Sequence, residues 1–398
     1  MKPRMIFVSA EFPGPPTSGG LLRTSFLLRC LGRHFDIHFV TFAEGEPSPG
    51  ALAGIQPPVG KTTVLPLEPH RREPLARYAR NLGRALRFVP PLVDRFAEPE
   101  ARRALEALLA AGADWVWLEH LWLAPYAASI PAGATAVLDA HNVESEYYRQ
   151  LRCTARRPFE WMGYYIFEQA ASRIEQRYLP RFDRVIAVSE EDRQRLARAC
   201  PAARIVVLPN AVRCRDCRVS SPASKPSLYF AGRLDYLPNR EGVLWFYQRV
   251  WPLVRSRLPE VKWFVVGGSP ELLGPALRRD PGIVLTGQVE SIEPYLHPST
   301  LVVVPIALGG GTRFKILEAW AAGKAVVSTA KGAEGLAARH GENIWLANTP
   351  EGFGQAILHL LSDPELCARL GQNGWETVRE HYSWERLEER IETLILQT

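Results

Sequence analysis

The chain has 398 residues, enough for two domains that each bury a core of their own. Hydrophobic residues make up 46% and charged residues 23%, which excludes a disordered or fibrous protein, and no apolar run approaches the roughly 18 residues of a membrane span. A formal net charge of +6 suits an acidic partner, such as a phosphate-bearing substrate, nucleic acid or an anionic membrane, without choosing among them.

The opening MKPRMIFVSAEF holds only a strand-length apolar run, too short for the core of a signal peptide, and so predicts a cytoplasmic protein. Cytoplasmic thiols are normally reduced, and we expect the six cysteines to form no disulfide framework. Cys214 and Cys217 have the CxxC spacing of redox and zinc sites. No second pair or nearby histidine accompanies them in the sequence, and we interpret the spacing as incidental.

The first half of the chain alternates between strand and helix patterns. Residues 5–10 and 36–42 are apolar runs that predict strands, and the segment between them, 21–32, predicts a helix with one buried face. These three elements form a βαβ unit. Residues 44–69 are rich in Pro and Gly, and their apolar residues show neither a helical nor a strand periodicity, which indicates a surface connection. Further strands are predicted at 114–119, 136–140, 184–189 and 204–208, and further helices at 100–111 and 159–178.

A basic amphipathic stretch follows the surface connection. Between residues 70 and 87, leucines and aromatic residues are interleaved with His70, Arg71, Arg72, Arg77, Arg80, Arg84 and Arg87. Such a stretch suits docking on an anionic bilayer, where a lipid-linked acceptor would lie. A helix face in contact with water is the alternative interpretation.

Polar residues gather where one predicted strand ends, in the segment LDAHNVES. Asp139, His141 and Glu144 lie at its carboxyl end, the usual position of functional residues in an open α/β sheet. A histidine at the edge of a core is either a satisfied structural residue or a catalytic one, and the pattern alone does not decide between them.

A second series of strands and helices begins after a polar segment. From Asn210 to Pro226 the chain is rich in Pro and Ser, and we place an interdomain linker there. Strands are predicted in SLYFAG, VKWFVVGG, GIVLTG and TLVVVPI, whereas only helices are predicted from Pro350 onward. The predicted boundaries are 1–212 for the first domain, 213–226 for the linker, 227–380 for the second domain and 381–398 for a C-terminal helical segment.

The strand TLVVVPI leads into the segment GGGTRFKILEAWAAGKAVVST. Its three glycines, 309–311, expose backbone N–H groups, and Thr312 stands at an N-cap position before a helix. Lys315 and Glu318 lie three residues apart and therefore share a helix face. A cation, a carboxylate and free amides thus converge at the carboxyl edge of a sheet. The alternative is an ordinary strand-to-helix turn with an exposed Lys–Glu pair.

This segment resembles the donor-site motif of glycosyltransferase family 4, also called glycosyl transferases group 1, the retaining enzymes with the GT-B fold found in bacterial exopolysaccharide systems. The segments SGGLLRT, FDRVIAVSEED, VVLPNAV and Tyr382–Trp384 are also similar to that family. The resemblance implies an α/β protein of two Rossmann-like doubly wound domains facing across a cleft, with a C-terminal helix that crosses back to the N-terminal domain. It implies transfer of a sugar from a nucleoside diphosphate sugar to an acceptor hydroxyl, in the synthesis of cell-surface polysaccharide or glycoconjugate.

The resemblance also implies roles for individual residues. Glu318 binds the ribose hydroxyls, and His141 contacts the donor sugar near its reacting carbon and is the predicted catalytic residue. The other predicted donor-binding residues are Gly20, Arg233, Gly310, Gly311, Thr312, Arg313 and Lys315. The family's first Glu is replaced here by Gly310, and Pro238 and Asn239 occupy the region where a Lys usually follows the Arg. We expect Lys315, with Arg313, to supply the missing charge.

No DxD-type aspartate pair is evident, and the resemblance implies a reaction that needs no metal ion or other cofactor. The leaving phosphate would accept the proton of the incoming hydroxyl, so no separate base is named. The expected partners are the nucleotide-sugar donor and an acceptor sugar or lipid-linked glycan, with peripheral contact to the inner face of an anionic membrane and no nucleic acid. Two alternatives stay open: a nucleotide-sugar epimerase of the same fold, and a non-catalytic nucleotide-sugar-binding protein, which Gly310 would favour.

Overall fold

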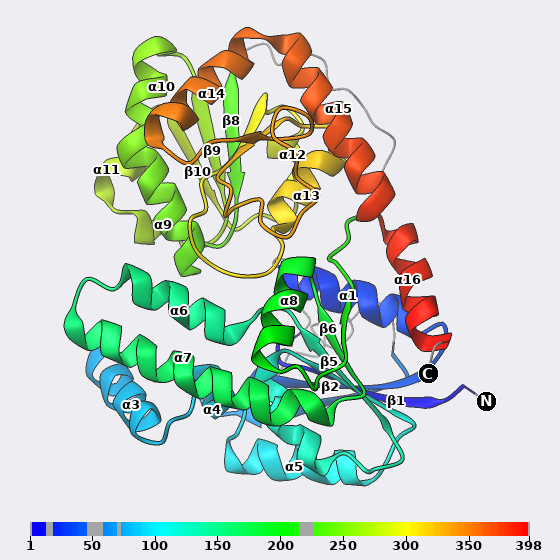
Figure 1. The fold of residues 1–398 in the computed structure, drawn as a ribbon. Coiled ribbons are helices and arrows are strands. Elements are labelled where there is room, and N and C mark those ends of the chain that lie inside the picture. Colours follow the sequence, from blue (N-terminus) through cyan, green and yellow to red (C-terminus); the bar gives the residue numbers. More distant parts are fainter. Residues whose placement is uncertain (1, 13–18, 46–58, 70–72, 215–225, 397–398) are drawn as a thin grey trace. The chain divides into compact units, whose positions relative to one another are not determined.

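The computed structural model describes residues 2–12, 19–45, 59–69, 73–214 and 226–396. The chain divides into two compact units, Met1–Pro209 and Asn210–Thr398, called unit 1 and unit 2 below. Each unit contains its own parallel sheet with helices packed around it (Figure 1). Cys217, the basic residues 70–72 and most of the predicted linker, residues 215–225, lie outside the described residues.

Unit 1 is built on a sheet of seven parallel strands in the described residues, in the order β3-β2-β1-β4-β5-β6-β7. The strands are β1 (Arg4–Ser9), β2 (Asp36–Glu44), β3 (Lys61–Leu67), β4 (Trp115–Glu119), β5 (Thr135–Ala140), β6 (Arg184–Ala187) and β7 (Ile205–Val207). Chain order reverses between β1 and β4. Ligands of open α/β sheets bind beyond the carboxyl ends of the strands at such a switch point.

The helices of unit 1 lie on both faces of this sheet, which explains why β4 and β5 carry continuous apolar runs (Figure 1). They are α1 (Gly19–Leu31), α3 (Pro74–Leu86), α4 (Pro91–Arg95), α5 (Pro99–Ala110), α6 (Glu144–Thr154), α7 (Pro158–Tyr178) and α8 (Glu190–Ala199), with short 3₁₀ turns η1 (Leu121–Ser129) and η2 (Leu179–Arg181).

One sequence prediction is wrong in unit 1. The stretch 44–69 is not only a surface connection, because Lys61–Leu67 forms the edge strand β3, paired in parallel with β2 from His38 to Glu44. Its polar start and Pro66 hide the strand pattern in the sequence. Pro is tolerated in this strand because one side of an edge strand has no ladder partner.

Unit 2 has six parallel strands in its described part, in the order β10-β9-β8-β11-β12-β13. They are β8 (Ser227–Ala231), β9 (Lys262–Val266), β10 (Ile283–Gly287), β11 (Leu301–Val304), β12 (Val326–Ser328) and β13 (Trp345–Leu346). Counted within the unit, this is the order 3-2-1-4-5-6 of dinucleotide-binding sheets, with the switch point between β8 and β11.

The helices of unit 2 include one broken by a π turn: α9 (Leu237–Trp245) continues through the π turn η3 (Phe246–Val250) into α10 (Trp251–Arg257). The others are η4 (Pro270–Leu273), α11 (Pro275–Arg278), α12 (Glu293–Leu296), α13 (Phe314–Ala321), α14 (Pro350–Ser362), α15 (Pro364–His381) and α16 (Trp384–Leu396). The prediction of helices without strands after Pro350 is confirmed for the described residues. None of the described helices is both long and apolar enough to cross a membrane.

Candidate functional site

Each unit carries a polar cluster at the carboxyl ends of the strands beside its switch point. We call the group Arg23, Glu119, Asp139 and His141 the His141 cluster. We call the group formed by Gly232, Asn239, residues 308–312, Lys315 and Glu318 the loop site. All members of a cluster belong to one unit, so each is described by itself.

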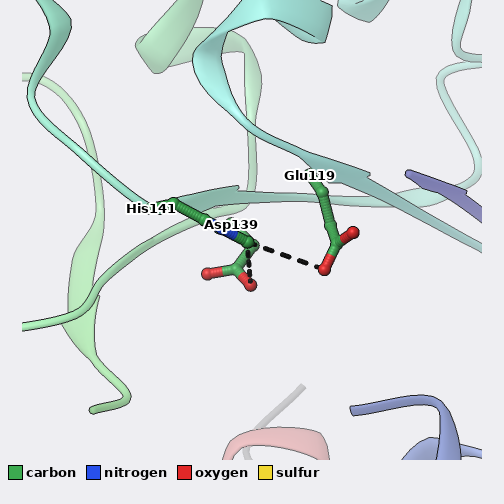
Figure 2. A group of neighbouring side chains, drawn as sticks. All are labelled: Glu119, Asp139 and His141. Carbon is green, nitrogen blue, oxygen red and sulfur yellow. Dashed lines mark ion pairs between the residues drawn. The ribbon is translucent and has the colours of Figure 1, made fainter. Parts of the chain in front are cut away.

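The His141 cluster is assembled from three elements. Glu119 ends β4, Asp139 lies in β5 with His141 just after it, and Arg23 comes from α1. Arg23 donates to both oxygens of Asp139, from Nε to Oδ2 and from Nη2 to Oδ1, each at 2.8 Å. Figure 2 shows His141 facing the two carboxylates, with Nε2 at 3.4 Å from Asp139 Oδ2 and 3.6 Å from Glu119 Oε1. All four side chains are buried.

These groups neutralise one another. Burial lowers the pKa of His141, but the neighbouring carboxylates of Asp139 and Glu119 outweigh that effect and raise its pKa to about 9. Burial likewise opposes the ionised form of Asp139, yet Arg23 and His141 hold the pKa of Asp139 well below its usual range. Two carboxylates therefore face one guanidinium and one imidazolium, and the charges of the cluster offset one another.

The spacing of Glu119, Asp139 and His141 would also allow a metal ion, since their ligand atoms lie within 4.8 Å of one another. The donor set does not fit one well. Both oxygens of Asp139 are occupied by Arg23, and a bound cation would lie beside that buried guanidinium. A proton on His141 supplies one positive charge at this position, since the pKa of that residue is raised to about 9.

A chain of aromatic and acidic groups, most of them buried, continues from the cluster. The ring of His120, whose backbone φ is +67°, stacks on Trp122 at 4.0 Å and lies 3.8 Å from the ring of His141. Trp122 Nε1 donates to Glu144 at 3.0 Å. Glu175 accepts from the backbone N–H and hydroxyl of Ser145 at the start of α6. Burial raises the pKa of both Glu144 and Glu175 to about 7.

Gly20 lies in the first turn of α1, beside this cluster. Its carbonyl accepts from the hydroxyl of Thr24 at 3.1 Å, and Thr24 also lies 2.8 Å from a carboxylate oxygen of Glu119. A Cβ at Gly20 would lie 3.0 Å from the carboxylate of Glu11, so the glycine allows a close approach within unit 1. The predicted role of Gly20 in donor binding stays a prediction.

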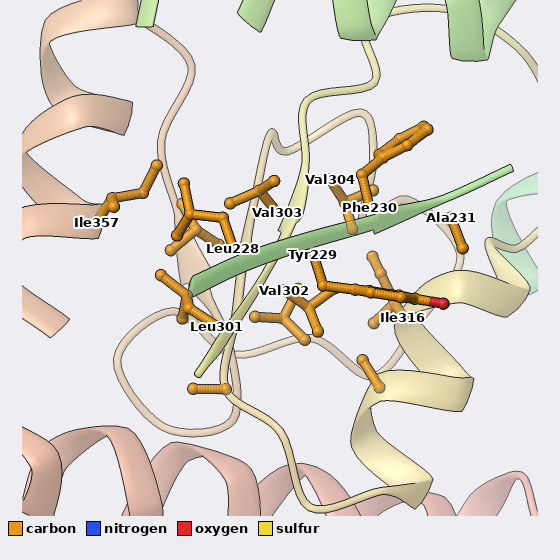
Figure 3. Close-up of a cluster of buried hydrophobic side chains, with 14 of the residues drawn as sticks. Leu228, Tyr229, Phe230, Ala231, Leu301, Val302, Val303, Val304, Ile316 and Ile357 are labelled. Atoms are coloured by element: carbon orange, nitrogen blue, oxygen red, sulfur yellow. The ribbon is translucent and has the colours of Figure 1, made fainter. Parts of the chain in front are cut away.

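The loop site stands on a fully buried base. Figure 3 shows Leu228, Tyr229 and Phe230 of β8 packed among the residues of β11 and beside Ile316 of α13. Because these strands are covered on both faces, the segments that leave their carboxyl ends start from fixed positions. The glycine-rich loop after β11 and the segment that starts with Gly232 after β8 are therefore held side by side.

Arg313 shapes the glycine-rich loop from within. Its Nη1 donates to the carbonyls of Gly310 and Gly311, the latter at 3.1 Å, and its Nη2 donates to the carbonyl of Leu308 at 3.1 Å. Gly309 and Gly311 have φ values of +100° and +69°, a region that side chains rarely adopt. The guanidinium therefore braces a tightly folded loop.

The loop leaves its amides available. In the described part of the chain, the backbone N–H groups of Gly310, Gly311 and Thr312 donate no hydrogen bond. The prediction of Thr312 as N-cap is wrong: Arg313 occupies that position, with φ −90° and ψ 101°, because the loop stays extended for one more residue. The hydroxyl of Thr312 accepts instead from Nδ2 of Asn210 at 2.7 Å.

Lys315 connects the loop with the end of β8. Its Nζ donates to Asn239 Oδ1 at 2.6 Å and lies 4.2 Å from the centre of the Phe230 ring. A Cβ at Gly232 would lie 2.9 Å from this ammonium group and 2.6 Å from Nδ2 of Asn239, so only glycine fits there. Burial, with a smaller contribution from Arg313, lowers the pKa of Lys315 to about 7.

Glu318 lies one turn further along α13. Burial raises its pKa to about 7, and the charge of Lys315 only partly opposes the shift. No described residue forms a hydrogen bond or ion pair with its carboxylate. The hydroxyl of Tyr229, a side chain only 2% exposed, also lacks a partner among the described residues, and burial together with the charge of Glu318 raises its pKa. The loop site thus holds polar groups that the fold does not satisfy.

Arg233 follows Gly232, but its guanidinium forms an exposed ion pair with Asp235, from Nη2 to Oδ2 at 2.7 Å. Its backbone carbonyl accepts from Asn239. The backbone at Arg233 thus belongs to the loop site, while contact of its side chain with a diphosphate stays a prediction.

Comparison with known proteins decides the family. Residues 23–216 match the family model described as Glycosyltransferase Family 4, and residues 225–363 match the one described as Glycosyl transferases group 1. The chain belongs to this family of glycosyltransferases. The first matched region covers most of unit 1 and reaches the start of unit 2, and the second lies in unit 2; together they include Arg23, His141, Lys315 and Glu318.

Solved glycosyltransferase structures share the whole fold. Sucrose-phosphate synthase from Thermosynechococcus elongatus is 17% identical, with a TM-score of 0.69 over 100% of this chain and 99% of that one. HepE from Anabaena, in complex with UDP and glucose, is 16% identical, with a TM-score of 0.68 over 100% of both chains. TarM from S. aureus, in a complex that contains UDP, is 13% identical, with a TM-score of 0.69 over 98% of this chain and 99% of that one. The predicted GT-B fold with two Rossmann-like domains is confirmed.

A curated relative of this glycosyltransferase comes from Klebsiella pneumoniae and is described as an uncharacterized 44.6 kDa protein in the cps region. It is 23% identical over 266 residues. The match covers 62% of this chain and spans 64% of the length of that protein.

Four residues in or beside these clusters were not predicted from the sequence: Arg23, Glu119, Asn239 as a partner of Lys315, and Tyr229. Arg23 lies in the quoted segment SGGLLRT, and Glu119 ends a predicted strand. Polar residues at strand ends and just after the first loop were therefore the available signal. Tyr229 gave no such signal, because its position in the sequence is that of an ordinary residue within an apolar strand.

Proposed function

We propose that this glycosyltransferase transfers a sugar from a nucleoside diphosphate sugar to an acceptor hydroxyl with retention of the anomeric configuration. The observation that carries the proposal is the set of free N–H groups at Gly310, Gly311 and Thr312, next to the half-buried Lys315. Donors of this kind match the oxygens of a diphosphate. The UDP in the HepE and TarM complexes supports a nucleoside diphosphate as the ligand.

In this proposal the loop site stabilises the departing diphosphate. The amides and Lys315 meet the negative charge that develops on the leaving group, where fixed donors require no reorganisation. Glu318 accepts hydrogen bonds from the ribose hydroxyls. We further propose that no metal ion is needed, since Lys315 becomes charged when the diphosphate arrives and so supplies the cation, and that the leaving phosphate takes the proton of the acceptor hydroxyl.

We also propose a setting for the reaction. The relative from the cps region supports a role in the synthesis of a cell-surface polysaccharide. The acceptor would then be a sugar or a lipid-linked glycan, and the enzyme would act in the cytoplasm, where nucleotide sugars are available.

Glu318→Gln tests the donor assignment. The substitution removes a charge-assisted hydrogen bond worth about 1.5–3 kcal/mol, so the affinity for the preferred nucleoside diphosphate should fall by roughly 10- to 100-fold. A thermal-shift panel of nucleoside diphosphate sugars first identifies that nucleotide, and calorimetry then gives the affinity. Glu342→Gln is the matched control, because its exposed side chain pairs with Arg339 on the surface of the same unit. Equal affinity for the wild type and Glu318→Gln would refute the ribose role.

The reaction itself is tested separately. Release of nucleoside diphosphate that depends on an added acceptor, with a product of the same anomeric configuration by NMR, is the expected result. Conversion of the donor sugar without an acceptor would show an epimerase, and donor binding without turnover would show a binding protein. Turnover should persist after treatment with EDTA, and its loss, restored by a divalent ion, would contradict the metal-free proposal.

A further inference from the structure

Helix α3 turns its apolar side to solvent. Leu75, Tyr78, Leu82 and Leu86 recur every three or four residues and so lie on one face, and their exposed fractions are 84%, 61%, 50% and 80%. Arg84 projects from the opposite face and is buried in an ion pair with Asp94 at 2.8 Å. A helix that packs on a protein core normally has the reverse orientation, with its apolar stripe inward. The apolar stripe of α3 therefore does not serve the core of unit 1.

A second exposed apolar group lies on α7, which packs against α3 in unit 1 (Figure 1). Its members are Phe159, Trp161, Met162 and Tyr165. Arg173 of α7 lies over the ring of Phe88, just after α3, at 4.2 Å and joins the two helices. Of the twelve large hydrophobic side chains that are exposed among the described residues, eight belong to α3 and α7. We call these eight side chains the apolar face.

The charges around the apolar face have one predominant sign. Helix α3 contains three arginines and no acidic residue, and Arg87, which pairs with Asp94 at 2.9 Å, follows it. On the side of α7, Arg152, which pairs with Glu168 at 2.7 Å, lies over the ring of Trp161 at 5.4 Å, and Arg157 lies over the ring of Phe159 at 5.8 Å. Leucine, tryptophan and tyrosine bordered by arginine form the composition that enters the boundary between lipid headgroups and acyl chains.

We propose that the apolar face binds reversibly to the surface of an anionic lipid bilayer. The leucines and aromatic rings would enter the headgroup boundary, while Arg157, which lies over the exposed ring of Phe159, would meet the acidic headgroups. A second copy of the chain fits less well, because a two-fold symmetric contact would place this basic surface against itself. The inference rests on unit 1 alone and does not depend on the proposed donor site.

Vesicle binding tests the proposal with the full-length protein. The wild type should sediment with vesicles that contain phosphatidylglycerol about tenfold or more better than with vesicles of phosphatidylcholine alone, and added salt should weaken the binding. Equal binding to both kinds of vesicle, or binding to neither, would overturn the proposal.

Two matched variants separate the apolar face from hydrophobicity in general. Leu82→Glu combined with Leu86→Glu should lower partitioning onto anionic vesicles by about tenfold or more, because two exposed leucines no longer enter the bilayer. Leu253→Glu combined with Leu272→Glu changes two leucines of unit 2 that are 40% and 43% exposed, and should leave partitioning unchanged. Equal losses in the two variants would refute the assignment to α3.

Controls for folding and self-association complete the test. The melting temperatures of both variants should stay near that of the wild type, because the substituted side chains are exposed. Light scattering without lipid should give the mass of one chain. A dimer that Leu82→Glu with Leu86→Glu dissolves would show that a second copy, rather than a membrane, covers the apolar face.

Discussion

The two units place polar groups at corresponding edges of similar sheets, but they satisfy those groups differently. In unit 1, Arg23 and His141 bring two positive charges to the two carboxylates of Asp139 and Glu119. In unit 2, the carboxylate of Glu318 and the free loop amides find no partner among the described residues. Both clusters contain buried polar groups, but only in the His141 cluster do positive and negative charges offset one another.

The pKa values express this difference. Burial would lower the pKa of His141, yet its carboxylate neighbours raise that pKa to about 9, so the fold stabilises the charged form. Burial lowers the pKa of Lys315 to about 7, so the fold disfavours its charge. A cluster that neutralises itself contributes to folding, whereas one left incomplete is available to a ligand.

The largest expected effect comes from Arg23→Ala, which leaves Asp139 and Glu119 buried with only one cation. Removing one partner of a buried ion pair costs about 3–5 kcal/mol, and denaturant unfolding of unit 1 should show a loss of that size. Arg193→Ala breaks an exposed pair with Glu190 in the same unit and should cost less than about 1 kcal/mol. Similar losses in the two variants would show that the His141 cluster is not a folding element.

The variant His141→Ala tests whether the His141 cluster also takes part in the reaction. If His141 stabilises the transition state, turnover should fall by on the order of 10²-fold while donor affinity changes little. Melting temperature, donor affinity and turnover are measured on the same variant. A destabilised enzyme with nearly normal turnover would leave His141 with a structural role only.

The titration of His141 gives this test an independent readout. Because its pKa is raised in the folded state, its stabilisation is fully present below the ordinary pKa of 6.5 and is lost as the pH rises through about 9. His141→Ala should lack this loss of stability at alkaline pH.

Lys315→Ala should separate ligand binding from folding. Affinity for the nucleoside diphosphate should fall by roughly 10- to 100-fold and affinity for the bare nucleoside should not change, because only the diphosphate meets the ammonium group. Stability should not fall, since burial disfavours that charge. Calorimetry and thermal unfolding measure the two effects, with Lys331→Ala as the control, a lysine paired with Glu334. Equal losses for nucleoside and diphosphate would remove Lys315 from the phosphate site.

The smallest expected effect is an exchange of protons on binding. At about pH 8 Lys315 is mostly neutral, so binding of the diphosphate should take up a fraction of a proton. At about pH 6 Glu318 is mostly protonated, so binding of the ribose hydroxyls to its carboxylate should release a fraction of a proton. Binding enthalpies in buffers of different ionisation enthalpy measure both. A bare nucleoside should show only the release, and enthalpies that do not depend on the buffer would contradict the two assignments.

Most strands and helices could be predicted because apolar runs and helical periods are local. Edge strand β3 could not, since its pairing with β2 depends on a neighbour rather than on its own pattern. The same limit applies to the His141 cluster. Arg23 and Asp139 are 116 residues apart in sequence, and they meet because β1 lies beside β4 and β4 beside β5. A single sequence indicates where strands end, but it does not give their order in the sheet.

The loop site was easier to predict because Lys315 and Glu318 lie on one short helix. The contacts of the loop site that were not predicted were missed for the same reason as those in unit 1: the partners are far apart in the sequence. Asn210, which occupies the hydroxyl of Thr312, lies 102 residues away in sequence, and Asn239, which holds Lys315, lies 76 residues away. Side chains that satisfy each other over such distances leave no local pattern.

The bracing of the glycine-rich loop by Arg313 has a consequence for the speed of binding. Three carbonyls of the loop are already tied to one guanidinium before any ligand arrives, so the entropy of ordering the loop is lost during folding rather than during encounter. Nucleotide association should then proceed in a single fast phase without a slow rearrangement of the loop. In Arg313→Ala, stopped-flow traces should gain a slower second phase, and donor specificity is therefore better redesigned at residues other than Arg313.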